Sequence, residues 1–376
     1  MFWMGLTPAV KKYLTDNRPR MIDEIVTLGK IPAPSNHEEK RAQWCKEYLE
    51  SFGAKGVYID SALNVVYPYH AEGCDELVAF LGHTDVVFPD TDELPVRIEG
   101  DTIYGPGIGD DTANAVAVME MARMVTEMNL TPKTGILFVL NTGEEGLGNL
   151  KGVCQVMEDY KGRVSRLFAI DGNYRKVVND AVGSKRYRIE LKTEGGHSYG
   201  DFGNRNAIYY MSQMISTFYA MKVPDLGKTT YNVGLIQGGT SVNTIAQSCE
   251  MYYEYRSDKR EALEIMDRLF ENCIATYRSM GVEVDVELVG NRPCKGDVDN
   301  SHLVELVRSA AKEHGLEMTT CSGSTDCNIP LSQGVPAVCF GVYLGEGAHT
   351  RGEHISISSL DVGMEIFAQV VLSHFE

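Results

Sequence analysis

Four continuous apolar segments constrain the fold of this chain more than any other feature of the sequence. They span residues 77–81, 135–140, 166–170 and 335–342. Segments with helical periodicity separate them. A strand that is apolar on both faces must be buried on both faces, so it belongs to a sheet with helices on either side. The sequence therefore predicts an α/β domain built on a mixed sheet that helices cover on both faces.

Residues 184–292 have a different pattern, in which strand residues alternate between apolar and polar side chains. The predicted order is strand, helix, strand, strand, helix, strand, which is that of a ferredoxin-like α+β unit. The full chain of 376 residues is also longer than one compact core usually takes. We therefore expect one domain in two parts, residues 1–183 and 293–376, with residues 184–292 inserted as a second domain.

The charge of the chain argues against two classes of partner. A net charge of −17 would repel nucleic acid and anionic membranes. No segment approaches the length of a membrane span, and the apolar start from Met1 to Leu6 is too short for a secretory signal. The nine cysteines include no C-x-x-C pair, which is typical of reduced thiols. We expect a cytoplasmic protein that binds neither nucleic acid nor membrane.

Side chains that bind metals follow the apolar segments or lie in nearby loops. These residues are His83, Asp110, Glu144, Glu145, Asp171 and His349. In sheets covered on both faces, ligands gather at the carboxyl ends of the strands. Histidine nitrogen and carboxylate oxygen are ligands for zinc-like metals. The sequence predicts a metal site at this edge, with the two oxygens of the central Asp110 as a candidate bridge between two metals.

Each of these signals has a simpler explanation when it is taken alone. Asp110 and Asp111, like the Glu144–Glu145 pair, could be acids at the start of a helix. His83 could be a strand-end histidine bonded to any neighbour, whereas in the functional interpretation Asp85, on the same face of an extended segment, holds the second nitrogen of a metal-bound His83. His354 competes with His349 as a ligand. A helix is also expected over residues 37–52, with Ser35 and Glu38 forming its capping box.

The order of the motifs resembles one enzyme family. H-x-D at 83–85, G-x-G-D-D at 107–111, E-E at 144–145, D-G at 171–172 and H-x-x-x-E at 349–353 are similar to the co-catalytic dizinc peptidases and deacylases. That family includes peptidase T, carnosine dipeptidases, glutamate carboxypeptidase, acetylornithine deacetylase and aminoacylase. The resemblance covers nearly the whole chain and is strongest to peptidase T-like members. It continues in residues 195–198, 238–243, 255–257 and 323–330.

The resemblance implies a role for each residue. Asp110 would bridge two divalent metals, zinc being expected and cobalt or manganese being alternatives. His83 and Asp171 would complete one metal site, and Glu145 and His349 the other. Glu144 would be the general base for a water between the metals, and Asp85 would orient His83. His197 would stabilise the oxyanion, and the substrate-binding residues would be Asn243, Arg256, Gly323 and Ser324. A cis peptide is expected between Asp110 and Asp111.

Two departures from the family pattern bear on the substrate and the pocket. Many relatives have lysine where this chain has Thr112, which removes a positive charge beside the metals. Many deacylases have glutamate where this chain has Asp171, and aspartate is more similar to the aminopeptidases and dipeptidases. The resemblance therefore implies a metallohydrolase that cleaves the amide bond of short peptides, as a tripeptidase-like aminopeptidase. The alternatives are an N-acyl amino acid deacylase or dipeptidase, or a non-catalytic binding protein.

The inserted domain is also implicated in assembly. In relatives with a lid of this size, two lids join edge to edge in a twofold dimer, and the lid histidine reaches the metal site of the other subunit. By resemblance, residues 184–292 would form a homodimer in which His197 completes the partner's site. The alternative is that His197 only caps a local turn in the sequence Gly-Gly-His-Ser.

Overall fold

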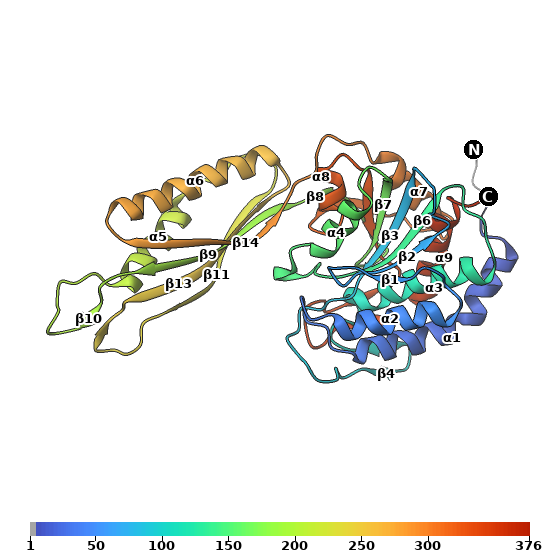
Figure 1. The fold of residues 1–376 in the computed structure, drawn as a ribbon, viewed down its shortest axis with the longest axis horizontal. Helices are drawn as coiled ribbons and strands as arrows, with labels where there is room; N and C mark the ends of the chain where they lie inside the picture. The colour runs from blue at the N-terminus through green and yellow to red at the C-terminus, as the bar shows by residue number, and fades with distance from the viewer. Residues whose placement is uncertain (1–4) are drawn as a thin grey trace. The chain divides into compact units, whose positions relative to one another are not determined.

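The computed structural model describes residues 5–376, so the first four residues of the apolar start lie outside it. The chain forms two compact units (Figure 1). One comprises the residues up to Ala181 together with Gly296–Glu376, and the other comprises Val182–Lys295. The sequence analysis placed the inserted domain at 184–292.

The first unit is built on an eight-stranded mixed sheet with the order β1-β2-β6-β3-β7-β16-β8-β15. The strands are β1 (Tyr58–Ile59), β2 (Val65–Tyr69), β3 (Leu77–His83), β6 (Gly135–Asn141), β7 (Val164–Ile170), β8 (Lys176–Ala181), β15 (Thr319–Gly323) and β16 (Ala337–Phe340). The four central strands β6, β3, β7 and β16 run parallel to their neighbours in this group. Their carboxyl ends therefore meet at one edge of the sheet.

Helices cover both faces of this sheet, which is why its central strands are apolar throughout. The helices of this unit are α1 (Pro8–Lys30), α2 (Glu39–Ser51), α3 (Asn114–Glu127), α4 (Lys151–Asp159), α7 (Ser301–Lys312), α8 (Asn328–Ser332) and α9 (Ser359–Leu372). Phe80 and Phe138 belong to the core under α1, α2, α3, α7 and α9. Leu81 and Val139, the next residues along the same strands, belong to the core under α4 and α8. Alternate residues of each strand thus supply two separate cores.

A small second sheet places two distant loops side by side. Its order is β17-β18-β5-β4, with β4 (Arg97–Glu99), β5 (Thr102–Tyr104), β17 (Gly345–Glu346) and β18 (His354–Ser356). Because β5 pairs with β18, the glycine-rich loop that follows β5 lies beside the segment that precedes β18. Short helical turns η1 (Ile108–Ala113) and η2 (Gly146–Gly148) follow the glycine-rich loop and the Glu144–Glu145 pair.

The second unit has the predicted ferredoxin-like order. Its sheet has the order β11-β13-β9-β14 and is antiparallel, with two helices on one face. The elements are β9 (Gly183–Lys192), α5 (Ala207–Ala220), β11 (Thr229–Gly238), β13 (Ser248–Ser257), α6 (Arg260–Ser279) and β14 (Glu283–Arg292). A short ribbon of β10 (Gly196–His197) and β12 (Thr244–Ile245) extends from it. The predicted fold class is confirmed for both units.

Within residues 5–376, none of the helices has the length and hydrophobicity that crossing a lipid bilayer requires.

Candidate metal centre

The structure places four predicted metal ligands of the first unit around Asp110, namely His83, Glu145, Asp171 and His349, and it places Glu144 beside His83 and Glu145. One oxygen of Asp110, Oδ1, lies 3.2 Å from His83 Nε2, and the other, Oδ2, lies 3.1 Å from His349 Nε2. His349 Nε2 is also 3.0 Å from Glu145 Oε1. Asp171 offers a carboxylate oxygen within 4.8 Å of ligand atoms of His83 and Asp110. The two oxygens of Asp110 therefore face two different histidines.

The parallel strands explain why these side chains meet. His83 is the last residue of β3, and Asp171 follows the last residue of β7 directly. Glu144 and Glu145 follow β6 after a two-residue turn. Asp110 and His349 come from the two loops that the small sheet places side by side. All of them lie at the carboxyl edge of the large sheet or in the loops beside it, as the sequence pattern predicted.

Glu353 holds the loop that carries Asp110. Its buried carboxylate accepts hydrogen bonds from the backbone N–H groups of Gly107 (2.8 Å), Gly109 (2.8 Å) and Asp110 (2.7 Å). Sequence analysis recorded this glutamate only as the end of the H-x-x-x-E motif and gave it no role. The peptide bond between Asp110 and Asp111 is cis, as expected.

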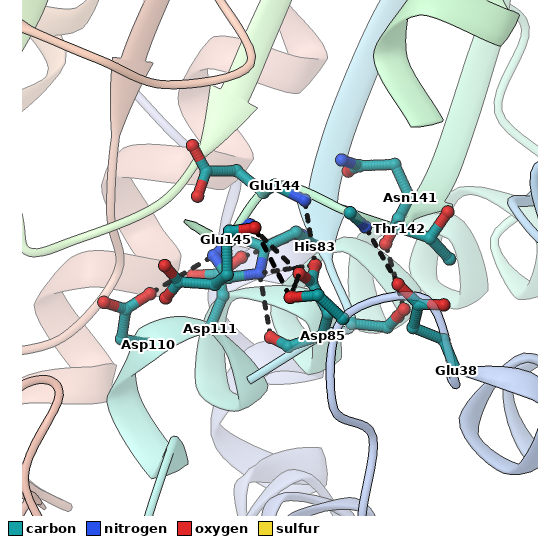
Figure 2. A network of polar contacts seen from close by, with 12 residues as sticks. Glu38, His83, Asp85, Asp110, Asp111, Asn141, Thr142, Glu144 and Glu145 are labelled. Carbon is teal, nitrogen blue, oxygen red and sulfur yellow. Dashed lines mark hydrogen bonds and ion pairs between the residues drawn. The ribbon is translucent and has the colours of Figure 1, made fainter. Parts of the chain in front are cut away.

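Asp85 has a larger role than the predicted orientation of His83. Its Oδ1 lies 3.4 Å from His83 Nδ1, and its two oxygens accept hydrogen bonds from the backbone N–H groups of Glu144 and Glu145, both at 3.0 Å. Figure 2 shows Asp85 between the His83 ring and this backbone. The hydroxyl of Ser35 also donates to Asp85, at 2.6 Å. One buried carboxylate thus holds both a candidate ligand and the backbone of the candidate base.

The predicted capping box of the second helix is wrong. Helix α2 begins at Glu39, and its N-cap residue Glu38 makes no side-chain cap bond. The Glu38 carboxylate instead accepts hydrogen bonds from Gly143 N–H (3.1 Å) and from the Lys151 ammonium (2.9 Å). Ser35 and Glu38 therefore support the loop of Glu144 and Glu145 rather than the start of the helix.

The electrostatics of the centre favour positive charge at its middle. Hydrogen bonds to Asp110 and Glu145 raise the pKa of His349 to about 10. Burial alone would lower the pKa of His83, but the nearby carboxylates, Asp111 first among them, raise it well above its usual value. Burial and the charge of Asp110 raise the pKa of Asp171 to about 7. Carboxylates crowded in this way are stabilised by cations.

The donor set fits two divalent metal ions that share Asp110. One group of ligand atoms comes from His83, Asp110, Asp111 and Asp171, and another comes from Asp110, Glu145 and His349. Within each group the ligand atoms lie within 4.8 Å of one another. Among the described residues these groups contain only nitrogen and oxygen ligands, which suit zinc, cobalt or manganese.

The structure decides between several of the alternatives. His354 packs against Tyr104 with the rings tilted and their centroids 5.2 Å apart, and it belongs to none of the metal-binding groups found in residues 5–376. Asp111 does not cap helix α3: its carboxylate accepts from His83 N–H (2.9 Å) and from the Asn114 side chain (2.7 Å). Glu144 and Glu145 precede η2 and lie outside the first turn of α4.

The predicted substrate residues and His197 are spread over both units. In the second unit, His197 pairs with Thr244, and Asn243 accepts a hydrogen bond from Ser198 N–H (3.0 Å). Arg256 lies near the far end of β13 from this ribbon and bonds to Glu254 (2.9 Å). In the first unit, Gly323 ends β15, and Ser324 follows it.

The ring of His197 is held by its own loop. Its Nδ1 accepts hydrogen bonds from the backbone N–H groups of Tyr199 and Gly200, both at 3.2 Å. The neutral ring therefore carries its proton on Nε2, which makes Nε2 a hydrogen-bond donor. The side chain is exposed. The predicted local turn is present, and it leaves a donor available for a second role.

A family comparison decides the classification. The description "Peptidase family M20/M25/M40" matches residues 79–373. The chain belongs to this peptidase family. The match spans Asp110, the four other predicted metal ligands, Glu144 and Glu353, and the resemblance inferred from the motifs is confirmed. This M20-type chain is a metal-dependent hydrolase.

Relatives with assigned activities differ in their substrates. The chain is 27% identical to the uncharacterized protein YqjE of Bacillus subtilis, over 94% of this chain and 98% of that one. It is 26% identical to succinyl-diaminopimelate desuccinylase of Corynebacterium glutamicum, over 89% of this chain and 91% of that one. A tripeptidase from Staphylococcus aureus has the same fold, with a TM-score of 0.77 and 24% identity, covering 94% of this chain and 98% of that one.

Proposed function

We propose that this chain is an aminopeptidase that cleaves the amide bond of short peptides, tripeptides above all. The observation that carries the proposal is the carboxylate of Asp110 between His83 and His349, at 3.2 and 3.1 Å, with Glu144 and Glu145 beside it. A bridging carboxylate with histidine and acid ligands on each side suits a pair of metals that act on one substrate.

The residues around Asp110 would hold the metals in two sites. His83, Asp110 and Asp171 would form one site, and Asp110, Glu145 and His349 the other. Two bound metals supply a Lewis acid for the scissile carbonyl and lower the pKa of a water molecule.

Glu144 is the proposed general base. Its carboxylate oxygen lies within 4.8 Å of ligand atoms of His83 and Glu145, and it is buried. It would take a proton from the attacking water and pass it to the leaving nitrogen. Asp85 would position this base, because it holds the backbone N–H of Glu144. In Figure 2 the Glu144 carboxylate points away from Asp85.

The other groups would bind substrate charge. The Nε2–H of His197 would donate to the oxyanion, and the guanidinium of Arg256 suits a carboxylate. Asn243 and the Gly323–Ser324 turn are proposed to contact the substrate backbone.

A homodimer through the second unit is part of the proposal. The sheet of this unit has two edge strands, β11 and β14. Strand β11 exposes Leu235 (66%) and Ile236 (54%), and Tyr209 on the adjacent α5 is 58% exposed. An apolar edge that pairs with its own copy across a twofold axis is protected from other pairing. This supports a dimer in which His197 completes the site of the partner subunit.

A deacylase is the second candidate, because a desuccinylase is among the relatives. Desuccinylation and peptide cleavage both hydrolyse an amide, and they differ in whether the substrate has a free amine on the acyl side. Aspartate at position 171 favours the peptidase, by resemblance to the aminopeptidases and dipeptidases.

A hydrolysis panel tests the choice. Free tripeptides, free dipeptides, N-acetyl amino acids and N-succinyl amino acids would be assayed with added zinc, cobalt or manganese, with Glu144→Ala as the blank. We expect free tripeptides to give the highest kcat/KM. A preference of tenfold or more for an acylated amino acid would assign the chain to the deacylases instead.

A further inference from the structure

Behind the metal centre lies a buried arginine that neither the motifs nor the proposed mechanism uses. Arg41, on α2, is fully buried and is the largest fully buried side chain in the described part of the chain. Its Nε donates to the carbonyl of Ile31 at 2.9 Å. Its Nη1 donates to the carbonyl of Thr84 at 3.0 Å and lies 3.2 Å from the hydroxyl of Thr112.

These contacts connect Arg41 to the two segments that carry acidic residues of the centre, residues 83–85 and 110–112. Thr84 lies between His83 and Asp85, and Thr112 follows Asp111 directly. The Thr112 hydroxyl in turn donates to the carbonyl of Gly107 at 2.6 Å, within the glycine-rich loop. The guanidinium therefore lies on the protein side of the loops that present the ligands.

The partners of Arg41 are not those of an ordinary buried ion pair. All three hydrogen bonds go to neutral oxygens, and Nη2 has no hydrogen-bond partner within residues 5–376. Taking a guanidinium out of water without a paired anion is costly. Burial lowers the pKa of Arg41 to about 10, although the charges of Asp85 and Asp111 act in the opposite direction. The side chain stays cationic at neutral pH, and the acids of the centre supply the compensating field.

We propose that Arg41 is a fixed counter-charge of the metal centre, which stabilises its crowded carboxylates whenever the metals are absent. It is a positioning residue, because it acts through the loops of His83–Asp85 and Asp110–Thr112 and not on the substrate. The inference rests on the metal-binding part of the proposed function and is independent of the choice of substrate.

The proposal makes a prediction with a definite sign. Without the positive charge of Arg41, the carboxylates of the metal-free centre repel one another more strongly. The same carboxylates then attract divalent cations more strongly. Arg41→Gln should therefore destabilise the metal-free protein more than the zinc-loaded protein. We expect the difference in Tm between zinc-loaded and chelator-treated protein to widen by at least about 4 °C. Zinc binding, measured by competition with a chromophoric chelator, should tighten by about fivefold or more.

Two further variants separate charge from shape. Arg41→Lys keeps the positive charge but loses the planar guanidinium group. Both Tm values of this variant can therefore fall, but the difference between the zinc-loaded and chelator-treated Tm should stay within about 2 °C of the wild-type difference. Leu49→Ala removes a fully buried apolar side chain from the same helix and should lower both Tm values equally. The proposal is contradicted if the Tm difference between zinc-loaded and chelator-treated Arg41→Gln is equal to or smaller than that of wild type. It is also contradicted if Arg41→Lys widens this difference as much as Arg41→Gln does.

Folding failure is also informative. An Arg41→Gln protein that is recovered only from zinc-supplemented cultures supports the counter-charge, because it is the metal-free state that needs it. If neither Arg41→Gln nor Arg41→Lys can be recovered with zinc present, Arg41 is a structural tie and the proposal is wrong. If wild-type protein binds no zinc, cobalt or manganese, the proposed function itself fails.

Discussion

At the scale of single residues, Glu144 and Glu145 show how two adjacent, identical side chains take different positions. Both backbone N–H groups bond to Asp85, which fixes this stretch of chain. The Glu145 carboxylate then lies 3.0 Å from His349 and within reach of Asp110. Glu144 shares a group of ligand atoms with His83 and Glu145 but is not in the group of Asp110 and His349. This difference in surroundings supports the proposed roles, in which Glu145 is a ligand and Glu144 is the base.

This difference can be tested by isosteric substitution. Glu144→Gln should retain both metals and lose turnover by about 10²–10⁴-fold, because an amide binds water but does not accept its proton. Glu145→Gln should instead lose one metal. Metal content per chain and kcat would be measured for both proteins. Near wild-type turnover in Glu144→Gln would show that the roles of the pair are assigned wrongly.

Thr112 and Arg41 show what a single sequence position does not reveal. The family resemblance implied a lysine at position 112, so the sequence suggested only that a positive charge is missing there. In the structure a guanidinium nitrogen lies 3.2 Å from the Thr112 hydroxyl, and it comes from residue 41. A charge supplied from 71 positions away along the chain has no local sequence signal.

At the scale of helices and strands, the sequence was most informative where burial dictates composition. The four apolar segments correspond to β3, β6, β7 and β16, because strands covered on both faces bury mostly apolar side chains. The alternating pattern of the inserted unit was equally readable, since one face of its sheet carries charged residues such as Arg188 and Glu250.

Prediction from the sequence failed where the side chains of a local motif form hydrogen bonds with residues far away along the chain. Ser35 and Glu38 match a capping box, yet the only local bond among their side-chain hydrogen bonds in the described residues is the one that Glu38 accepts from Asn36 N–H, and the others include bonds to Asp85, Gly143 and Lys151. These last three partners lie 50 to 113 positions away along the chain, so only the fold brings them together. Residues that hold ligands in place, Glu353 among them, are subject to the same limit, because their chemistry resembles that of any buried carboxylate.

The two edges of the inserted sheet differ in a way that the sequence analysis did not anticipate. The exposed residues of the last strand, β14, include the acids Glu283, Asp285 and Glu287 as well as Leu288. The other edge, β11, exposes Leu235 and Ile236. Charged edges resist pairing and apolar edges favour it. For this reason we assign the proposed dimer contact to β11.

At the scale of the whole molecule, the proposed dimer makes each active site depend on two chains. His197→Ala and Glu144→Ala should each be nearly inactive as homodimers. Mixed dimers should regain activity, because one of their two sites then has both Glu144 and His197 intact. Differently tagged chains would be co-refolded, isolated by sequential pull-down and assayed with the best tripeptide.

The matched control is a mixed dimer of one Glu144→Ala chain and one Glu145→Ala chain. Each of its two sites then lacks one of these glutamates, so the control dimer should remain inactive. Mixed dimers of the first pair that form but stay inactive would show that His197 serves no site in the partner subunit.

The central claim is that Asp110 is shared by two metals, and metal content tests it most directly. Wild-type protein, Asp110→Ala and His349→Ala would be loaded with zinc, passed over a desalting column and analysed by mass spectrometry for zinc per chain. We predict about two zinc ions in the wild type, about one in His349→Ala and close to none in Asp110→Ala, because only Asp110 belongs to both sites. Retention of one or more tightly bound zinc ions by a folded Asp110→Ala protein would contradict the shared centre.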